Sequence, residues 1–226
     1  MNYFSESDIR DIVARVIAQS GLCTKPADQD PREEGREIPV EISARHVHLT
    51  REAMDTLFGN GSELTRKRDL SQPGQFLAEE RVKLVTARGQ LANVGILGPL
   101  RKEIQVELSL TDARTLGVEA PICLSGDLEG AADVLIVGPE GVVTARGAAI
   151  VAKAHVHMTP GDAREYGVHD GEHVSVRLGT ERAVTLNDVI VRVREDYALA
   201  VHIDFDEANA AQVSGSHITG LLQKAR

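Results

Sequence analysis

Two pairs of histidines in this sequence have the spacing of a metal site. His46 and His48 flank Val47, and further along the chain His155 and His157 flank a valine in a near repeat of the same stretch. Successive side chains of a β-strand point to opposite faces, so residues two apart leave the same face and can converge on one cation. A single His-x-His pair is a weak signal. Two copies, each followed by residues typical of a helix start, predict a metal centre.

The repeat extends beyond the histidines to four strand–helix units. In each unit a side chain able to bind a metal stands two residues before a Ser, Thr or Asp of the kind that caps a helix N-terminus. Those side chains are His48, Glu107, His157 and His202. With His46 and His155 they make a set too large for one tetrahedral ion. The pattern therefore predicts two zinc ions that share Glu107 as a bridge.

Basic residues near this set indicate an anion site. Arg101 lies shortly before Glu107, and its guanidinium group matches the paired oxygens of a phosphate or carboxylate. A second basic cluster contains Arg66 and Lys67 and leads through a Pro-Gly turn to Phe76. That stretch is equally typical of a nucleotide-binding loop and of an ordinary surface loop.

A further turn carries Ser125, a candidate hydrogen-bond donor to a substrate. The two cysteines, Cys23 and Cys123, are too few for a disulfide framework, so both are expected to be free thiols. They are also too few for a thiolate metal site. Any zinc must therefore be held by histidine and carboxylate.

Composition limits the classes of partner. The 226 residues carry a net charge of -9, with 3% aromatic residues and no Trp. This balance argues against nucleic-acid binding and against attraction to an anionic membrane surface. Neither a long apolar span nor a basic-then-apolar signal segment appears in the sequence. The sequence therefore predicts a cytoplasmic protein.

The elements that must position these side chains are mostly strands. Short runs rich in Val, Ile and Leu alternate with Gly or Asn/Asp turns. The predicted strands are 38–48, 81–86, 90–97, 104–108, 134–137, 147–157, 173–178, 183–193 and 198–204. Short helices are predicted at 51–58, 110–116 and 160–166. Many short strands with few helices favour a mainly β fold built of β-barrels over a doubly wound sheet.

The N-terminal segment has a different pattern. Residues 1–21 contain apolar side chains at i, i+3, i+4, i+7 and i+8, which is typical of an amphipathic helix. Residues 22–36 are polar and contain two prolines, as in a linker. A tethered amphipathic helix suggests a docking peptide for a partner. The alternative is a helix that packs on its own domain.

Five motifs together resemble the PduL-type phosphate propanoyltransferases. They are Ser-Ala-Arg-His-Val-His-Leu at 43–49, Asp-Leu-Ser-Gln-Pro-Gly-Gln-Phe at 69–76, Gly-Pro-Leu-Arg-Lys at 98–102, Ser-Gly-Asp-Leu at 125–128 and His-Val-His-Met-Thr-Pro at 155–160. The resemblance implies two β-barrels capped by short helices, with the active site between them. Residues 37–46 would join 155–226 in the first barrel, and 47–154 would form the second.

The resemblance also implies a dizinc site. His46, His48 and Glu107 would hold one ion, whose open position takes the sulfur of coenzyme A. Glu107 would bridge to the second ion, held also by His155, His157 and His202. Arg101 would bind phosphate, and Arg101 and Glu107 are the catalytic candidates. Ser125, Arg66, Lys67 and Phe76 are the candidates for binding coenzyme A.

One position departs from the family pattern. The second His-x-His motif usually follows an arginine, and here that residue is Ala154. The ligand set stays intact, but a supporting role of that arginine is put in doubt. The N-terminal helix resembles the encapsulation peptides that carry such enzymes into bacterial microcompartments, where it would bind shell or cargo proteins.

The expected reaction is transfer of a propanoyl or similar short acyl group between coenzyme A and phosphate. The partners are acyl-CoA and phosphate, without nucleic acid or membrane, and a homo-oligomer is expected. A dizinc hydrolase of a thioester fits the spacing alone equally well, and the resemblance decides between the two. A non-enzymatic reading is a metal-stabilised β-barrel that acts as a binding module.

Overall fold

The computed structural model describes residues 35–213, 215 and 218–224. The chain divides into two units, Met1–Glu34 and Gly35–Arg226, and the second unit carries the elements described below. The predicted amphipathic helix, most of the linker and Cys23 lie outside the described residues. Cys123 is a partly buried free thiol. None of the described helices is both long and apolar enough to span a bilayer.

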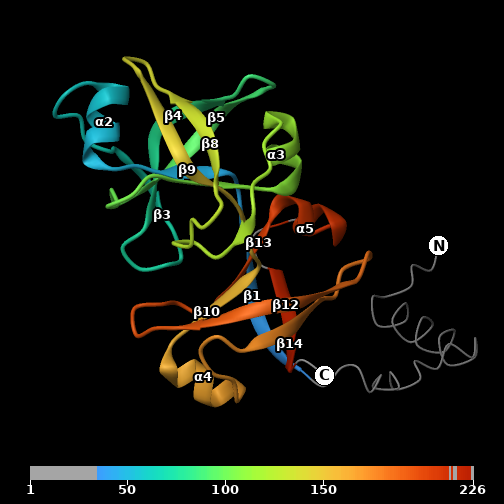
Figure 1. Cartoon of the computed structure of the whole chain (residues 1–226). Coiled ribbons are helices and arrows are strands. Elements are labelled where there is room, and N and C mark those ends of the chain that lie inside the picture. The colour runs from blue at the N-terminus through green and yellow to red at the C-terminus, as the bar shows by residue number, and fades with distance from the viewer. Residues whose placement is uncertain (1–34, 214, 216–217, 225–226) are drawn as a thin grey trace, which may run out of the picture. The chain divides into compact units, whose positions relative to one another are not determined.

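Six strands close the first barrel (Figure 1). In order around the barrel they are β1 (Arg36–Ser43), β13 (Ala200–Asp204), β10 (His155–Met158), β12 (Val184–Val193), β11 (His173–Leu178) and β14 (Ile218–Lys224). The two ends of this unit meet, because β1 runs antiparallel to β14 and parallel to β13. Buried Val, Ile and Leu side chains fill the interior, among them Ile38, Val176 and Val191.

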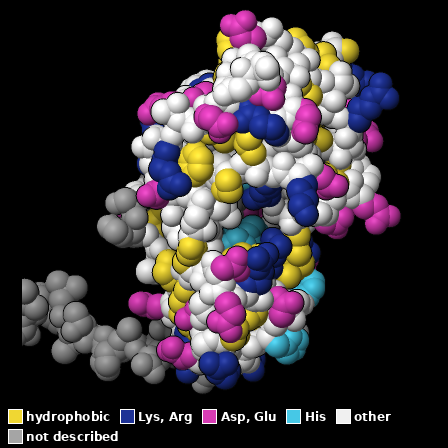
Figure 2. Space-filling view, turned by 90° about the vertical axis from the view of Figure 1, so that its left-hand side faces the viewer, with side chains coloured by type: hydrophobic (Ala, Val, Ile, Leu, Met, Phe, Trp, Pro, Cys, Tyr) yellow, Lys and Arg dark blue, Asp and Glu magenta, His cyan; other side chains and the backbone are white. Residues whose placement is uncertain are grey.

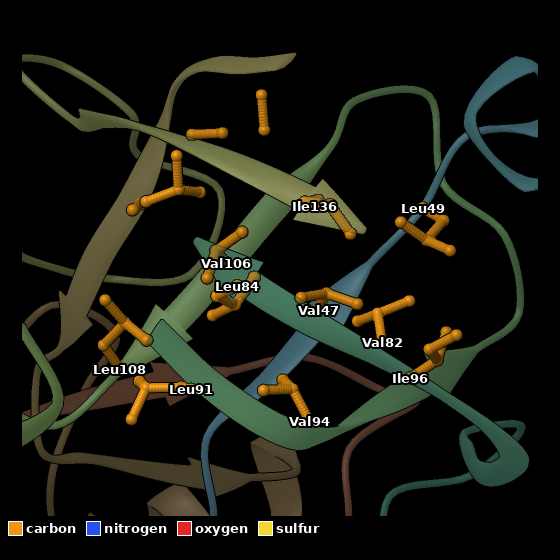
Figure 3. Close-up of a cluster of buried hydrophobic side chains, with 14 of the residues drawn as sticks. Val47, Leu49, Val82, Leu84, Leu91, Val94, Ile96, Val106, Leu108 and Ile136 are labelled. Atoms are coloured by element: carbon orange, nitrogen blue, oxygen red, sulfur yellow. The ribbon is translucent and has the colours of Figure 1, made fainter. Parts of the chain in front are cut away.

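A second barrel closes through the remaining long strands. Its ring runs through β4 (Phe76–Val85), β5 (Gln90–Gly98), β2 (His46–His48), β6 (Gln105–Leu108), β9 (Val142–Ala152) and β8 (Ala132–Val137), which pairs back with β4. Strands β3 (Arg66–Asp69) and β7 (Ile122–Cys123) extend it at β4 and β9. Figure 3 shows Val47, Leu84, Val94 and Ile136 in its apolar interior. The predicted mainly β fold of two barrels is confirmed.

Four short helices follow directly on the strands of the repeat. They are α2 (Arg51–Phe58), α3 (Leu110–Leu116), α4 (Pro160–Tyr166) and α5 (Phe205–Ala210). The N-caps Thr50, Ser109, Thr159 and Asp204 each accept a hydrogen bond from a backbone N–H of the first turn. This capping satisfies donors that the helix itself leaves free. Each N-cap therefore stands two residues after its metal-competent side chain, and the helix begins at the next residue.

Two of the predicted strands are broken in the structure, and three short strands, β3, β7 and β14, are not among those predicted. The predicted strand 38–48 is broken between β1 and β2, and 147–157 is broken between β9 and β10. Each break occurs where the chain passes from one barrel to the other, since β1 and β10 pair only within the first barrel and β2 and β9 only within the second. The change of partner strands ends the element, although the side chains on both sides of it favour β structure.

Candidate active site and metal centre

The predicted ligands gather into two groups of three. One group is His46, His48 and Glu107 of the second barrel, and the other is His155, His157 and His202 of the first. Within each group the ligand atoms all lie within 4.8 Å of one another. Strand register explains both groups. His46 stands opposite Glu107 on the antiparallel pair β2–β6, as His155 stands opposite His202 on β10–β13.

Backbone carbonyls orient three of the histidines. In each, Nδ1 lies at hydrogen-bond distance from a carbonyl oxygen: His46 from Ala44 at 2.8 Å, His48 from Leu97 at 3.2 Å and His155 from Lys153 at 2.8 Å. A ring nitrogen that donates to a carbonyl carries the proton, so Nε2 keeps its lone pair. This is the arrangement of a metal-ligating histidine.

Burial and charge set the protonation states. Burial lowers the pKa of His48 and of His202 to about 3, and that of His157 to about 2, with further lowering from neighbouring histidines. Burial alone would raise the pKa of Glu107, but its contacts with His46, His48 and Ser125 hold it well below the usual range. Neutral imidazoles and an ionised carboxylate are the forms that bind metal ions.

His46 differs from the other histidines in its protonation. Burial lowers its pKa, but attraction to the Glu107 carboxylate, whose Oε2 lies 3.5 Å from His46 Nε2, outweighs that effect and the pKa is raised. A divalent ion between these two atoms would take the place of the proton.

The surroundings of His157 show whether a metal ion fits the second group. Both of its ring nitrogens are buried, and neither has a hydrogen-bond partner among the described residues. Such a group is costly to leave unpaired. A cation bound by the group that contains His157 would satisfy one of the two nitrogens. The residues present therefore fit metal ions in both groups.

Both groups face one cavity of about 780 Å³. Its walls come from both barrels and include Arg101 and Ser125, whose Oγ accepts a hydrogen bond from Arg101 at 3.3 Å. Figure 2 shows histidine side chains in a hollow bordered by Lys and Arg. The arginines in the cavity wall are Arg45, Arg68, Arg81, Arg101, Arg192 and Arg194. An acidic chain thus gathers cationic groups where an anionic substrate would bind.

Comparison with known proteins identifies the family. The family described as PTAC, phosphate propanoyltransferase, matches residues 39–214. A phosphate propanoyltransferase of Alkaliphilus metalliredigens is 45% identical over 206 residues, 91% of this chain and 93% of that protein. Those of Thermotoga maritima (48% over 187 residues, 82% and 89% of the two chains) and Leptotrichia buccalis (50% over 186 residues, 82% and 87%) are similar as well.

The chain belongs to the phosphate propanoyltransferase family. It is an acyltransferase enzyme, and the resemblance inferred from the five motifs is confirmed. Members of this family are named for transfer to phosphate, which agrees with a cavity that presents several arginines beside the candidate metal groups.

Three residues considered for coenzyme A do not belong to the cavity wall of this propanoyltransferase. Arg66 and Lys67 are exposed, and Lys67 pairs with Glu79 at 3.2 Å. Phe76 is buried, with the Arg66 guanidinium 4.4 Å from its ring centroid. The neighbouring Arg68 lines the cavity instead. A register shift between Arg66 and Arg68 interrupts the simple alternation of side chains on β3.

Several residues of this propanoyltransferase escaped sequence reasoning. Gln105 is buried, donates to Glu107 Oε1 at 2.5 Å and to Ser125 Oγ at 2.8 Å, and accepts from the Gly126 N–H at 2.8 Å. Its position two residues before Glu107 on one strand was the available signal. Tyr197, Gln72 and Arg192 also surround the site. Tyr197 and Gln72 lie in loops whose sequence reads as exposed turn.

Proposed function

We propose that this propanoyltransferase catalyses acyl-CoA + phosphate = acyl phosphate + CoA, with propanoyl or a similar short acyl group, at a centre of two zinc ions. The observation that carries the proposal is the pair of three-ligand groups, one from each barrel, in a single cavity with Arg101. Histidine and carboxylate donors without cysteine suit zinc, and three protein ligands leave a position open for a substrate.

Each group would hold one ion. His46, His48 and Glu107 would hold the first, and His155, His157 and His202 the second, with Glu107 as the bridge. The Glu107 carboxylate lies near the second group as well, since its charge acts to raise the pKa values of all three of those histidines. When bound, the ions would stabilise the departing thiolate of coenzyme A and polarise the acyl carbonyl.

Arg101 would bind and orient phosphate. Its guanidinium is tied to the Ser125 hydroxyl, which itself accepts from Gln105, so the cation is held at the cavity wall before substrate arrives. Phosphate is already an oxyanion at neutral pH and needs no side chain to remove a proton before it attacks. The chain must therefore supply chiefly orientation and charge neutralisation.

Coenzyme A would lie along the arginine-rich wall. Ser125 and arginines such as Arg68 line the cavity that it would occupy. Arg66, Lys67 and Phe76 lie outside that lining, so any contact with coenzyme A would involve a part of it that extends beyond the cavity.

We also propose where this enzyme acts in the cell. Residues 1–21 would act as an encapsulation peptide that binds shell or cargo proteins of a bacterial microcompartment, with 22–36 as the linker to a homo-oligomeric enzyme. The support is the amphipathic pattern of the sequence.

The decisive experiment measures the release of free thiol from acyl-CoA. Zinc-loaded protein is incubated with propanoyl-CoA, with and without phosphate. Release that requires phosphate is expected, and it should be lost in His48→Ala but kept in the control His173→Ala, which changes an exposed histidine outside the cavity. Release without phosphate would instead identify a hydrolase. No release from propanoyl-CoA, acetyl-CoA or butanoyl-CoA would contradict the proposal and leave a binding module.

A further inference from the structure

His157 lacks the hydrogen bond that orients its neighbours. In His46, His48 and His155 a backbone carbonyl lies within reach of Nδ1 and sets the plane of the ring. In His202, Nε2 lies 3.3 Å from Nε2 of the Gln72 side chain, within hydrogen-bond distance. Neither nitrogen of His157 has such a partner among the residues described. Some other contact must therefore fix the rotation of this ring about its bond to Cβ.

The contact present is a stacked aromatic ring. Tyr197, in the loop between β12 and β13, lies with its ring centroid 4.0 Å from that of His157 and its plane tilted by 22°. Stacking at this distance leaves the edge of the imidazole free, where both nitrogens lie. It therefore restricts the ring plane without occupying a ligand atom.

The loop that carries Tyr197 is itself held from both barrels. Gln72, a buried residue of the second barrel, donates to the Ala198 carbonyl at 2.9 Å and accepts from the Ala198 N–H at 3.2 Å. On the side of the first barrel, the guanidinium carbons of Arg194 and Arg192 lie 5.1 and 5.9 Å from the centroid of the Tyr197 ring. These contacts give the ring a defined place before any ligand binds.

We propose that Tyr197 is a positioning residue for His157: its ring replaces the missing hydrogen bond and holds the imidazole edge toward His155 and His202. The inference rests on the proposed metal centre. It assigns the effect to the aromatic face and not to the phenol hydroxyl, so phenylalanine should serve at this position and an aliphatic side chain should not.

Cobalt binding tests the inference without relying on turnover. The full chain is freed of metal with a chelator and titrated with Co²⁺, whose visible absorption reports the geometry of each site. Wild type and Tyr197→Phe should bind two equivalents alike. Tyr197→Leu should bind one of them about 10- to 100-fold more weakly, with an altered spectrum for that equivalent alone. His157→Ala and His48→Ala identify which equivalent belongs to which group.

Each outcome decides one question. Equal affinity of Tyr197→Leu and wild type for both equivalents would overturn the proposal. So would equal weakening in the Phe and Leu variants, which would assign the effect to the hydroxyl, or weakening of both equivalents, which would indicate a general loss of structure. If wild type itself bound no cobalt, the dizinc function would fail first. The two failures are therefore distinguishable.

Discussion

At the scale of single residues, one of the arginines in the cavity wall carries the proposed role in phosphate binding. Arg101 is partly buried, and burial lowers its pKa while the Glu107 carboxylate counteracts this. Because an arginine stays charged at neutral pH under such conditions, it can neutralise phosphate without a proton transfer. Because Arg101 belongs to neither group of candidate metal ligands, a substitution there can be told apart from loss of metal in a mutational test.

Arg101→Ala should therefore impair phosphate use and spare the metals. Loss of a charged hydrogen-bonding partner for phosphate costs about 3 kcal/mol, which corresponds to a fall of about 100-fold in kcat/KM for phosphate. Metal content, measured on the same preparation, should stay at two ions per chain. The matched control is Lys102→Ala, the adjacent exposed cation that does not line the cavity. Unchanged phosphate dependence in Arg101→Ala would remove Arg101 from its assigned role.

At the scale of elements, Phe76 shows how a residue considered for binding can instead belong to the packing. A Cβ placed on Gly98 would come within 2.2 Å of the Phe76 ring, so the ring lies directly against the Gly98 backbone on the neighbouring strand. Phe76→Ala should destabilise the protein by about 3 kcal/mol, measured by urea unfolding, because it empties a filled core position. The KM for acyl-CoA should change little. A large rise in KM with normal stability would place Phe76 at the coenzyme A site.

The N-termini of α3 and α5 differ in one neighbouring positive charge. At the third helical position of α3, Asp112 forms an ion pair with Arg45. Glu207 holds the equivalent position in α5, but the residue equivalent to Arg45 is Ala154. Burial raises the pKa of Glu207 to about 7, and the Asp204 and Asp206 carboxylates act in the same direction. The negative charge of Asp112, in α3, acts to raise the pKa of Asp204. This side of the repeat therefore keeps a partly buried carboxyl without an equivalent of Arg45.

That difference predicts a pH effect on stability. The pKa of Glu207 is higher in the folded chain than its ordinary value of 4.5, so its stabilising contribution is complete below about pH 4.5 and is lost as the pH rises through 7. Glu207→Gln keeps an acceptor for the Asp204 N–H but cannot ionise. Between pH 5 and pH 8 the wild type should lose about 2 kcal/mol of unfolding free energy relative to this variant, after allowance for the exposed part of the group.

Urea unfolding at the two pH values measures this effect. Ala154→Arg, which restores the charge found at Arg45 in the first copy of the repeat, should reduce the loss. Parallel pH profiles for wild type and Glu207→Gln would show that the carboxyl is already ionised in the folded chain.

Some features of the fold and of the candidate site could be predicted from the sequence, and others could not. Strands and helix caps could be predicted because alternation, turns and N-caps are local signals. The candidate ligands could be proposed because four of them stand two residues before a helix cap and the other two, His46 and His155, share a strand face with the next histidine. The breaks at Ala44 and Lys153 could not, since a change of partner strand leaves no local mark. Tyr197 follows Arg-Glu-Asp and reads as a solvated turn, and its stacking on His157 exists only in the folded chain.

At the scale of the described unit, each barrel supplies one complete group of candidate metal ligands, and the two groups share one cavity. Among the described residues, few hydrogen bonds link the barrels at this place. Besides the contacts of Gln72, Ser71 Oγ donates to Glu41 Oε2 at 2.5 Å, and the Thr111 N–H donates to Asp206 Oδ2 at 2.7 Å. An ion bound in each group, with Glu107 shared between the two as proposed, would therefore add a further link between the barrels.

Removal of metal should accordingly lower the thermal stability. An ion present at about 1,000 times its Kd stabilises the folded state by about 4 kcal/mol, and a protein of this size gains about 2–4 °C in Tm for each kcal/mol. We expect chelation to lower Tm by about 10 °C and added zinc to restore it, as measured by calorimetry. The double variant His48→Ala/His157→Ala should melt at the same temperature with and without chelator. If the Tm of the wild type did not change with metal, this prediction would be wrong. The barrels would then hold the two groups together without ions.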